Sequence, residues 1–429
     1  MRDMRDSDTE TVPSAGEGTG RVRLGKQTFR SFKNPVYRLF FFAMVGLMAP
    51  MNMQIVGRSL LIYRITGSAA ILGAVTLAFA TPMLCMSLFG GIIADRLPKK
   101  HVIVAGMAGA ALVSLTIALA LTFDYLSPER PGSVWILAVA GAVQGTVMAL
   151  MMPSRMAILP EIVGKDQLMN AVSLSALEMN ALRLAAPALA GFLIEGFGFD
   201  VLYYTMAGFY LMGLILASRL PRTATVAAQG RSALAQIKEG LTYIRHNTTV
   251  LLLLIFTIFA VFLTMPYYVL MPVFTEDILG VGAGGLGILF SVSGAGAVIG
   301  SLILASLPNQ RRGLLFLIGS LVLSLALIGF SFSSSWHLSL ALTVVVGMGH
   351  TTRMALSNTL LQYYTEAEYR GRVMSVYTME LGLMGFGALA AGLLSEVVGI
   401  QWAIGGFAAA LVVVTLLATA FLPRIRTLA

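Results

Sequence analysis

Arg58, Glu178, Arg183 and Glu380 are ionisable residues that stand inside long apolar runs of this sequence. A charge is costly in hydrocarbon, so charged residues in such runs usually pair with one another or mark a path for ions or ligands. A carboxyl group that is shielded from water can also take up and release a proton near neutral pH. We therefore predict that Glu178 and Glu380 bind and release protons, and a purely structural hydrogen-bond network is the alternative for each.

Polar and aromatic residues in the same runs have the chemistry to line a cavity for a small molecule. The predicted cavity residues, which combine hydrogen-bonding groups with apolar surface, are Gln54, Arg58, Gln144, Arg183, Tyr267, Tyr268 and Tyr377. Tyr377 precedes Glu380 by three residues, so the two share one face of a helix. For each aromatic residue the alternative is ordinary packing in a bundle, and for Arg58 it is a side chain that reaches the membrane surface.

The elements that hold these residues must lie in lipid. Of the 429 residues 57% are hydrophobic and 11% charged, with a mean hydropathy of +0.83, whereas a soluble domain carries roughly 25% charged residues. A bilayer core of ~30 Å needs about 20 apolar residues per helix, and only helices or closed barrels can span it. The apolar runs are too long for barrel strands. They predict an all-α membrane protein with twelve transmembrane helices, at 36–63, 69–93, 101–123, 133–157, 168–194, 200–220, 249–275, 284–306, 313–333, 336–362, 371–395 and 401–422.

The placement of lysine and arginine predicts the orientation. If the N-terminus is cytoplasmic, cytoplasmic segments and helix ends hold 25 of the 29 basic residues, and outside connections hold only Arg64 and Arg130. This asymmetry follows the positive-inside rule and explains the net charge of +9 without nucleic acid as a partner. We expect a multi-pass protein of the cell (inner or plasma) membrane with both termini in the cytoplasm.

Two polar segments divide the chain. Residues 1–33 lack an apolar stretch, which predicts a disordered cytoplasmic tail rather than a signal peptide. Within the segment 221–248, apolar side chains recur at helical spacing (Leu234, Ile237, Leu241 and Ile244). This pattern favours an amphipathic helix on the cytoplasmic leaflet. A soluble linker helix is the alternative. The expected organisation is a tail at 1–33, an N-terminal six-helix bundle at 34–220, a linker at 221–248 and a C-terminal six-helix bundle at 249–429.

Short internal repeats predict that the two bundles are pseudo-symmetric. Gly90 and Leu97-Pro98 after the second run match Gly300 and Leu307-Pro308 after the eighth at one constant offset. Arg155-Met156-Ala157 in the fourth run matches Arg353-Met354-Ala355 in the tenth. Such duplicated bundles place a binding site between the halves and rock around it.

The turn after the second run, Gly91-x-x-x-Asp95-Arg96-x-x-Lys99-Lys100, resembles the signature loop of the major facilitator superfamily. The resemblance implies a cytoplasmic gate made by Gly91, Asp95, Arg96, Lys99, Lys100 and Arg155. In it Asp95 accepts hydrogen bonds from a helix N-terminus in the opposite half, and the basic residues stay with anionic lipid headgroups. A solvated turn that obeys the positive-inside rule is the alternative, and Pro98 stands where the family usually has glycine.

Further stretches resemble one branch of that superfamily. Residues 186–191 (APALAG) resemble the Gly-Pro-x-x-Gly-Gly motif of antiporters in degraded form, with Pro187 and Gly191 retained. Residues 157–163 and 370–375 are similar to stretches of the third drug:proton antiporter family, which includes macrolide efflux pumps and enterobactin exporters. Gln144-Gly145 resembles a further motif, but Gly141 replaces the arginine that the family links to proton transfer.

The resemblance implies a secondary transporter that exports small amphipathic or hydrophobic compounds in exchange for protons, by alternating access. The alternatives are a proton-independent facilitator, an importer, a lysophospholipid flippase, or a transport-inactive receptor or scaffold. We expect a monomer with a small-molecule substrate, protons and anionic lipids as partners, and neither enzymatic activity nor a cofactor nor a metal. Gly282-x-Gly284-x-x-Gly287 matches a dinucleotide fingerprint, yet it opens an apolar run, so these glycines are expected to serve helix packing.

The signature loop yields a first testable prediction. Replacing Asp95 by Asn removes the negative charge of the proposed gate while preserving side-chain size, so transport should slow and the inward-open state should gain population. Turnover in proteoliposomes is the measurement. An Asp95→Asn variant with unchanged turnover would remove the gating role.

Overall fold

The computed structural model describes residues 29–221, 233–307 and 310–428, and within these ranges the side chains of 88–96, 165–166, 233–237 and 381 lie outside the description. The described part is helical, with no strand. One bundle is built from the first half of the chain. Its elements are η1 (Arg30–Lys33), α1 (Pro35–Thr66), α2 (Ala69–Arg96), α3 (Lys99–Thr122), η2 (Pro131–Val134), α4 (Trp135–Val163), α5 (Lys165–Phe197) and α6 (Phe199–Ser218).

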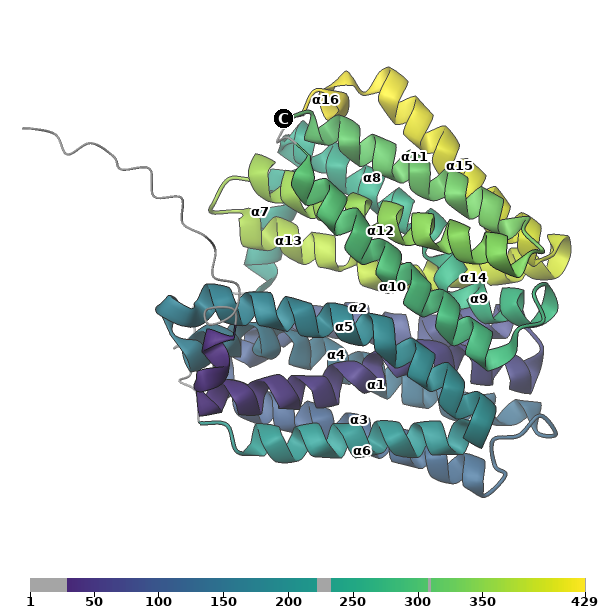
Figure 1. Ribbon diagram of the computed structural model, residues 1–429. Helices are drawn as coiled ribbons and strands as arrows, with labels where there is room; N and C mark the ends of the chain where they lie inside the picture. Colours follow the sequence, from purple (N-terminus) through teal and green to yellow (C-terminus); the bar gives the residue numbers. More distant parts are fainter. Residues whose placement is uncertain (1–28, 222–232, 308–309, 429) are drawn as a thin grey trace, which may run out of the picture.

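A second bundle is built from the other half and lies beside the first, closest to it at the end of Figure 1 away from the C-terminus. Its elements are α8 (Thr248–Thr264), α9 (Pro266–Asp277), α10 (Gly282–Ser306), α11 (Arg312–Ser331), α12 (Trp336–Tyr364), α13 (Arg370–Thr378), α14 (Glu380–Val398), α15 (Ile400–Phe421) and the short α16 (Pro423–Arg426). Since α8 and α9 form one broken span, as do α13 and α14, each bundle has six spans. The predicted fold of two six-helix bundles is confirmed.

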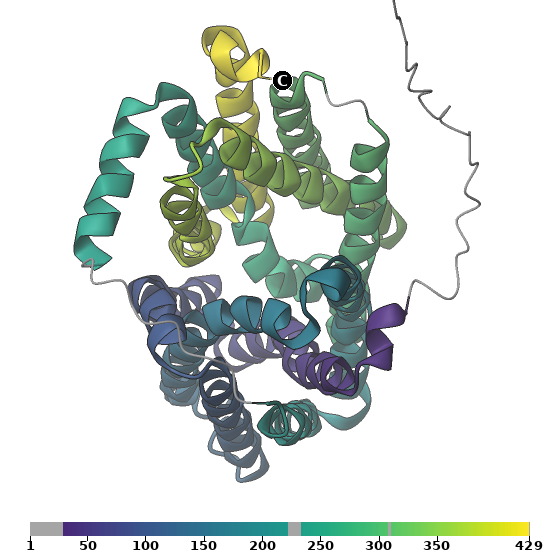
Figure 2. The same cartoon turned by 90° about the vertical axis from the view of Figure 1, so that its left-hand side faces the viewer.

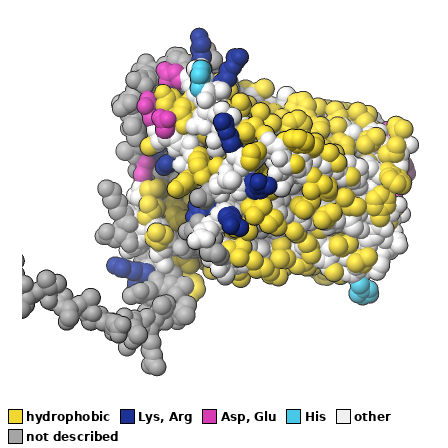
Figure 3. Space-filling model, turned by 90° about the horizontal axis from the view of Figure 1, so that it is seen from above, with side chains coloured by type: hydrophobic (Ala, Val, Ile, Leu, Met, Phe, Trp, Pro, Cys, Tyr) yellow, Lys and Arg dark blue, Asp and Glu magenta, His cyan; other side chains and the backbone are white. Residues whose placement is uncertain are grey.

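Eleven spans of the described part are long and apolar enough to cross a membrane. The remaining long helix, α12, has 29 residues but carries His350 and Arg353 in its middle. On the face seen in Figure 3, hydrophobic side chains cover most of the length, and the Lys and Arg side chains gather toward one end. A surface of this kind is suited to lipid around the middle of the molecule and water at its end.

Two spans break at identifiable residues. Pro266 has no N–H to continue the hydrogen-bond ladder, so α8 ends at Thr264 and α9 starts at Pro266. The second break lies at Met379, where the Met379 N–H donates to the Val376 carbonyl and the Gly382 N–H donates to the Met379 carbonyl. These bonds span three residues, which is the tight turn of a 3₁₀ segment. Glu380 therefore stands at an irregular point of its span.

The start of α1 and the C-terminus lie at the same end of the molecule, which we call the terminal end; the opposite end is the far end (Figure 1). The bundles meet toward the far end along two seams of small residues. In the first, between α2 and α14, a Cβ on Gly73 would lie 2.7 Å from the Leu389 Cα. In the second, between α5 and α10, a Cβ on Gly191 would lie 3.2 Å from the Gly287 Cα.

Polar contacts also join the two bundles at the far end. Arg64 of α1 pairs with Glu276 of α9 at 2.8 Å, and the Tyr63 hydroxyl donates to Asp277 at 2.6 Å. Glu396 of α14 also accepts hydrogen bonds from the start of the second span. The seams extend over residues 69–84 of α2 and residues 183–195 of α5. The parts of these two helices nearer the terminal end lie outside the seams. The structure is therefore closed at the far end.

The linker helix α7 (Ala233–His246) packs on α8 and α13 of the second bundle and lies at the periphery in Figure 2. Its Glu239 pairs with Arg372 of α13 at 2.8 Å, and its Tyr243 ring stacks on Tyr369 at 4.3 Å. Of the apolar stripe predicted for it, Ile244 is buried and Leu241 is exposed, while Leu234 and Ile237 lie outside the described side chains. A helix at this place was predicted, and its contact with a lipid leaflet stays a prediction.

The α5–α10 seam provides a matched pair of glycines for a test. A side chain on Gly191 would meet the backbone of Ala283 and Gly287, whereas nothing lies within 4 Å of a Cβ on Gly196, one and a half turns further along α5. Gly191→Val should therefore destabilise the closed state by about 1–3 kcal/mol through overpacking, and Gly196→Val should not. Melting temperatures of the purified variants check this, and equal values would contradict the seam as described.

Candidate functional site

Glu380, at the break between α13 and α14, belongs to a buried polar cluster in the second bundle. Its side chain is 7% exposed, and its Oε2 has no hydrogen-bond partner. It interacts with the Tyr377 hydroxyl and with the charge of Arg353 from α12. Arg353 is 1% exposed, and its Nε and Nη1 also lack partners. The acid and the base thus act on each other through space, without a direct ion pair.

Glu178 of α5 belongs to a corresponding cluster in the first bundle. Its side chain is 4% exposed, and neither carboxylate oxygen has a hydrogen-bond partner. It interacts electrostatically with Arg155 of α4 and with Tyr37 of α1, whose hydroxyl donates to the Ala171 carbonyl at 3.1 Å. Arg155 reaches the Met152 sulfur at 3.9 Å but does not form an ion pair with Glu178.

The two clusters are related by the duplication of the fold. In each, an arginine from the fourth helix of a bundle faces a glutamate from the fifth, beside a tyrosine. Arg155 and Arg353 are also the residues of the repeated Arg-Met-Ala sequence. Both acids stand immediately on the terminal side of the seams, since the seam contacts begin at residue 183 on α5 and at 382 on α14.

The predicted cavity residues of the first bundle fall into a third cluster. Arg58 of α1 lies with its guanidinium carbon 4.4 Å from the centre of the Phe79 ring and interacts with Tyr203 and Tyr210 of α6. Gln144 of α4 donates to the Tyr210 hydroxyl at 3.3 Å. Arg58 therefore points inward rather than extending to the membrane surface. Gln54, one turn before Arg58, is half-buried, and its contacts assign it no role.

Tyr377 belongs to the Glu380 cluster, and the remaining predicted cavity residues are Arg183, Tyr267 and Tyr268. Arg183 of α5 interacts with Tyr267 of α9 and with His350 of α12, so a cation of the first bundle acts on two polar groups of the second. The Tyr267 and Tyr268 rings are 5.3 Å apart and nearly perpendicular, and Tyr268 also packs on Phe290. Tyr267 is buried and Tyr268 half-buried. Arg183 thus connects the two halves at the edge of their seam.

Of the predicted gate residues, the side chains of Asp95 and Arg96 and the surroundings of Gly91 lie outside the described part. Lys99 is described and differs from the expectation that it reaches lipid headgroups. It is buried at the start of α3 and pairs with Glu161 of α4 at 2.7 Å, because the turn at Pro98 directs it back into the bundle. Lys100 is half-buried. Arg155 stands with Glu178, well inside the helix end.

The antiporter-like residues Pro187 and Gly191 lie on the α5–α10 seam. A Cβ on Gly287 of α10 would lie 2.5 Å from the Pro187 carbonyl oxygen and 3.2 Å from the Gly191 Cα. The two helices therefore cross with their backbones nearly in contact, as small residues permit. Gly287, from the apparent dinucleotide fingerprint, serves helix packing as expected.

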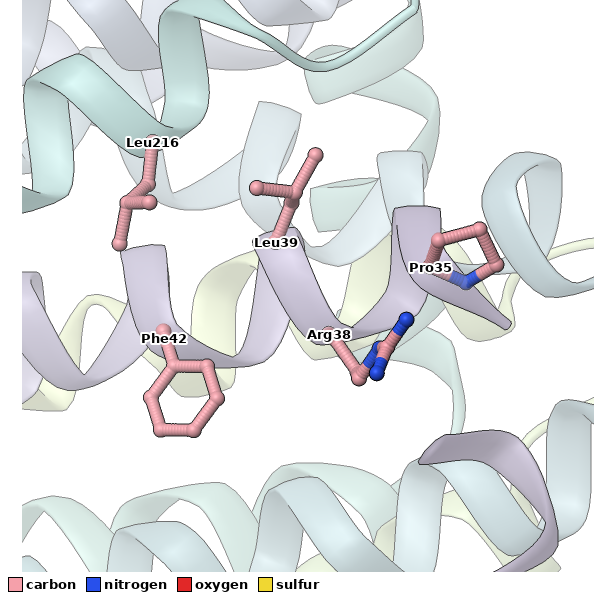
Figure 4. Close-up of a pocket in the computed structure, with 5 residues that line it drawn as sticks. All are labelled: Pro35, Arg38, Leu39, Phe42 and Leu216. Atoms are coloured by element: carbon pink, nitrogen blue, oxygen red, sulfur yellow. The ribbon is translucent and has the colours of Figure 1, made fainter. Parts of the chain in front are cut away.

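A surface groove of about 330 Å³ lies apart from all these clusters (Figure 4). It is lined by Pro35, Arg38, Leu39 and Phe42 of α1 and by Leu216 of α6. It holds none of the predicted site residues. Among the described residues, no group of three or more His, Cys, Asp or Glu side chains could hold a metal ion.

Several residues of these clusters were not predicted as site residues: Tyr37, Tyr203, Tyr210, His350 and Arg353. The spacing of Tyr203 and Tyr210 by seven residues places both on one face of α6. The spacing of His350 and Arg353 by three does the same on α12. That signal was present in the sequence, but it does not tell which neighbouring helix each face meets.

A polytopic helical fold of two related halves, with ionisable groups buried inside each half, is typical of a secondary transporter. The chain belongs to the Major Facilitator Superfamily, whose family model matches residues 39–386 and, in a second match, 311–429. The resemblance noted in the sequence is thereby confirmed. The protein is accordingly a multi-pass membrane transporter.

Three relatives indicate which branch of the superfamily the chain resembles. The chain is 21% identical to the staphyloferrin A transporter of Staphylococcus aureus over 78% of this chain and 83% of that one. It is 22% identical to macrolide efflux protein A of Streptococcus pyogenes over 78% and 83%. It is 24% identical to the enterobactin exporter EntS of Escherichia coli over 81% and 82%. These relatives carry siderophores and macrolides according to their names.

A solved structure supports the fold. The nucleoside transporter NupG superimposes with a TM-score of 0.73, at 13% sequence identity, over 90% of this chain and 98% of that one. At this identity the likeness concerns the fold alone, which agrees with the two bundles described above.

The Arg353–Glu380 arrangement predicts a non-additive effect on stability. Arg353→Gln leaves a buried carboxylate without its compensating charge, which should destabilise the protein by about 3–5 kcal/mol. The double variant Arg353→Gln/Glu380→Gln should recover much of that loss because no unpaired charge remains. Thermal unfolding of the two single variants and the double variant measures the coupling. Strictly additive losses would show that the two groups do not act on each other.

Proposed function

We propose that this transporter exports small amphipathic compounds in exchange for protons, by alternating access of the two bundles. The observation that supports it most directly is the duplicated Arg–Glu arrangement, with carboxylate oxygens that are buried and lack hydrogen-bond partners. A buried polar atom without a partner needs an explanation. A proton that comes and goes supplies one, because a protonated carboxyl is neutral and an ionised one is balanced by its arginine.

The mechanism follows from the position of the acids. When Glu178 and Glu380 are ionised, Arg155 and Arg353 are neutralised and each bundle is electrically balanced inside. Protonation frees the arginine charge, which then favours a different arrangement of the helices around it. Since both acids adjoin the seams, a proton gained on one side changes which end of the molecule is closed. Alternating protonation and substrate binding can in this way drive the rocking of the bundles.

The direction of the cycle rests on the charge distribution. The positive-inside rule assigns the basic terminal end to the cytoplasm, so the far-end closure would make the described state inward-facing. A substrate would then enter from the cytoplasm or the inner leaflet, displace protons inward, and leave at the far end. The relatives named for the export of enterobactin and the efflux of macrolides favour this direction over import.

The glutamates provide the test of proton coupling. In proteoliposomes with a pH-sensitive dye inside, a macrolide and enterobactin serve as probes, and substrate addition should release protons from the wild-type protein. Glu178→Gln and Glu380→Gln remove the proton-binding group but keep its size, so each should reduce proton release at least ten-fold.

The matched control is Glu129→Gln, which makes the same change in an exposed far-end loop and should leave proton release unchanged. If both buried variants still exchange protons for substrate, the coupling role is wrong. Transport of either probe without any pH change in the wild-type protein would instead identify a proton-independent facilitator.

A further inference from the structure

The interior of the first bundle holds a set of polar atoms that its own residues do not satisfy. They are the Nη1 of Arg58, the hydroxyl oxygen of Tyr203 and the Oε1 of Gln144, each buried and without a hydrogen-bond partner. They come from three helices, α1, α6 and α4, whose side chains meet around Arg58. In native proteins such orphan atoms are few, and several in one place point to a missing partner.

The charge of Arg58 is also uncompensated. Unlike Arg155 and Arg353, it faces no carboxylate: the described residues give it no ion pair, and the groups that act on it are the hydroxyls of Tyr203 and Tyr210. The Phe79 ring at 4.4 Å gives partial compensation through a cation–π contact. The Arg58 side chain is half-buried, and its Nη1 is buried without a hydrogen-bond partner. A cationic group held away from water without an anion is unfavourable, so this site favours a ligand that brings the negative charge.

The hydrogen-bonding groups of the cluster also favour a ligand with a negative charge. Tyr210 accepts from the Gln144 amide at 3.3 Å, so its own hydroxyl hydrogen remains available to a further acceptor. The Tyr203 hydroxyl and the Nη1 of Arg58 have no hydrogen-bond partner, and the Oε1 of Gln144 is the one acceptor among the three unpartnered atoms. Donors therefore outnumber acceptors, and an arginine fork fits two oxygens of a carboxylate.

We propose that the Arg58 cluster, formed by Arg58, Gln144, Tyr203 and Tyr210, binds the anionic group of the transported compound, and that this group is a carboxylate or a similarly shaped oxyanion. The inference rests on the proposed function, since it names the substrate class of that transporter. The aromatic rings of Phe79 and of the tyrosines give the apolar part of an amphipathic anion a surface to pack on. Neutral and cationic compounds of the same shape leave Arg58 uncompensated and bind more weakly.

The test compares three compounds with one apolar body and different charge: 4-cyclohexylbutanoate, its neutral amide, and 4-cyclohexylbutylammonium. Binding to the purified full-length protein is measured by calorimetric titration. The carboxylate should bind about ten-fold more tightly than the amide, as a charge-assisted hydrogen bond implies, and the ammonium compound should not bind detectably.

Variants test whether Arg58 and Tyr203 cause the preference for the carboxylate over the amide. Arg58→Gln should abolish the ten-fold difference between carboxylate and amide, and Arg58→Lys, which keeps the charge, should retain part of it. Tyr203→Phe removes one donor and should weaken carboxylate binding several-fold, which provides an answer even if Arg58→Gln does not fold. Arg130→Gln makes the same charge change in an exposed far-end loop and should have no effect.

The inference is overturned if the carboxylate binds no better than the amide, if it does not bind at all, or if its preference survives in Arg58→Gln. These outcomes can be distinguished from the result of the proton-coupling test. Carboxylate binding through Arg58 without proton release would retain the substrate class and refute antiport. Proton release with a macrolide but no carboxylate preference would retain antiport and refute the anion site.

Discussion

The structure depends on the unfavourable transfer of charge from water into a membrane interior. Every ionisable side chain that remains inside must be neutralised by a partner, a proton or a ligand. Two of the three buried clusters meet this requirement with an arginine and a glutamate held apart, and the third contains Arg58 without an acid. The same constraint therefore produces two kinds of site. The paired clusters are suited to the exchange of protons, and the unpaired one is suited to an anion.

The duplication of the fold gives this constraint its geometry. Because Arg155 and Arg353 come from equivalent helices, the two acid clusters lie at similar depths and on the same side of the inter-bundle seams. Under the proposed antiport, a single such cluster would couple only one bundle to the proton. With both, each bundle carries its own charge balance, and Arg183 adds a contact from the first bundle to Tyr267 and His350 of the second.

Composition and periodicity were sufficient for the fold. The predicted spans agree with the observed helices because twenty apolar residues in lipid have hardly any alternative to a helix. The burial of Glu178 and Glu380 and the proximity of Tyr377 to Glu380 also follow from spacing within single helices. What could not be predicted are the contacts between helices, such as Tyr37 with Glu178 or Tyr203 with Arg58. Rotations of neighbouring helices decide these contacts, and one sequence carries no direct record of them. Lys99 illustrates the same limit, since a charge near a helix end was expected in the headgroups and is instead paired with Glu161.

The glycine seams have a consequence for the energy of opening. At the crossings of α5 with α10 and of α2 with α14 much of the contact is between backbone atoms of small residues such as Gly73, Gly191 and Gly287. Parting them would expose peptide groups already hydrogen-bonded within their own helices, together with little hydrocarbon. Water that follows the separating helices would meet a nearly neutral wall, so wetting this surface is inexpensive. A closure made of leucines would adhere more strongly, and a carrier sealed in that way would pass slowly from one face of the membrane to the other.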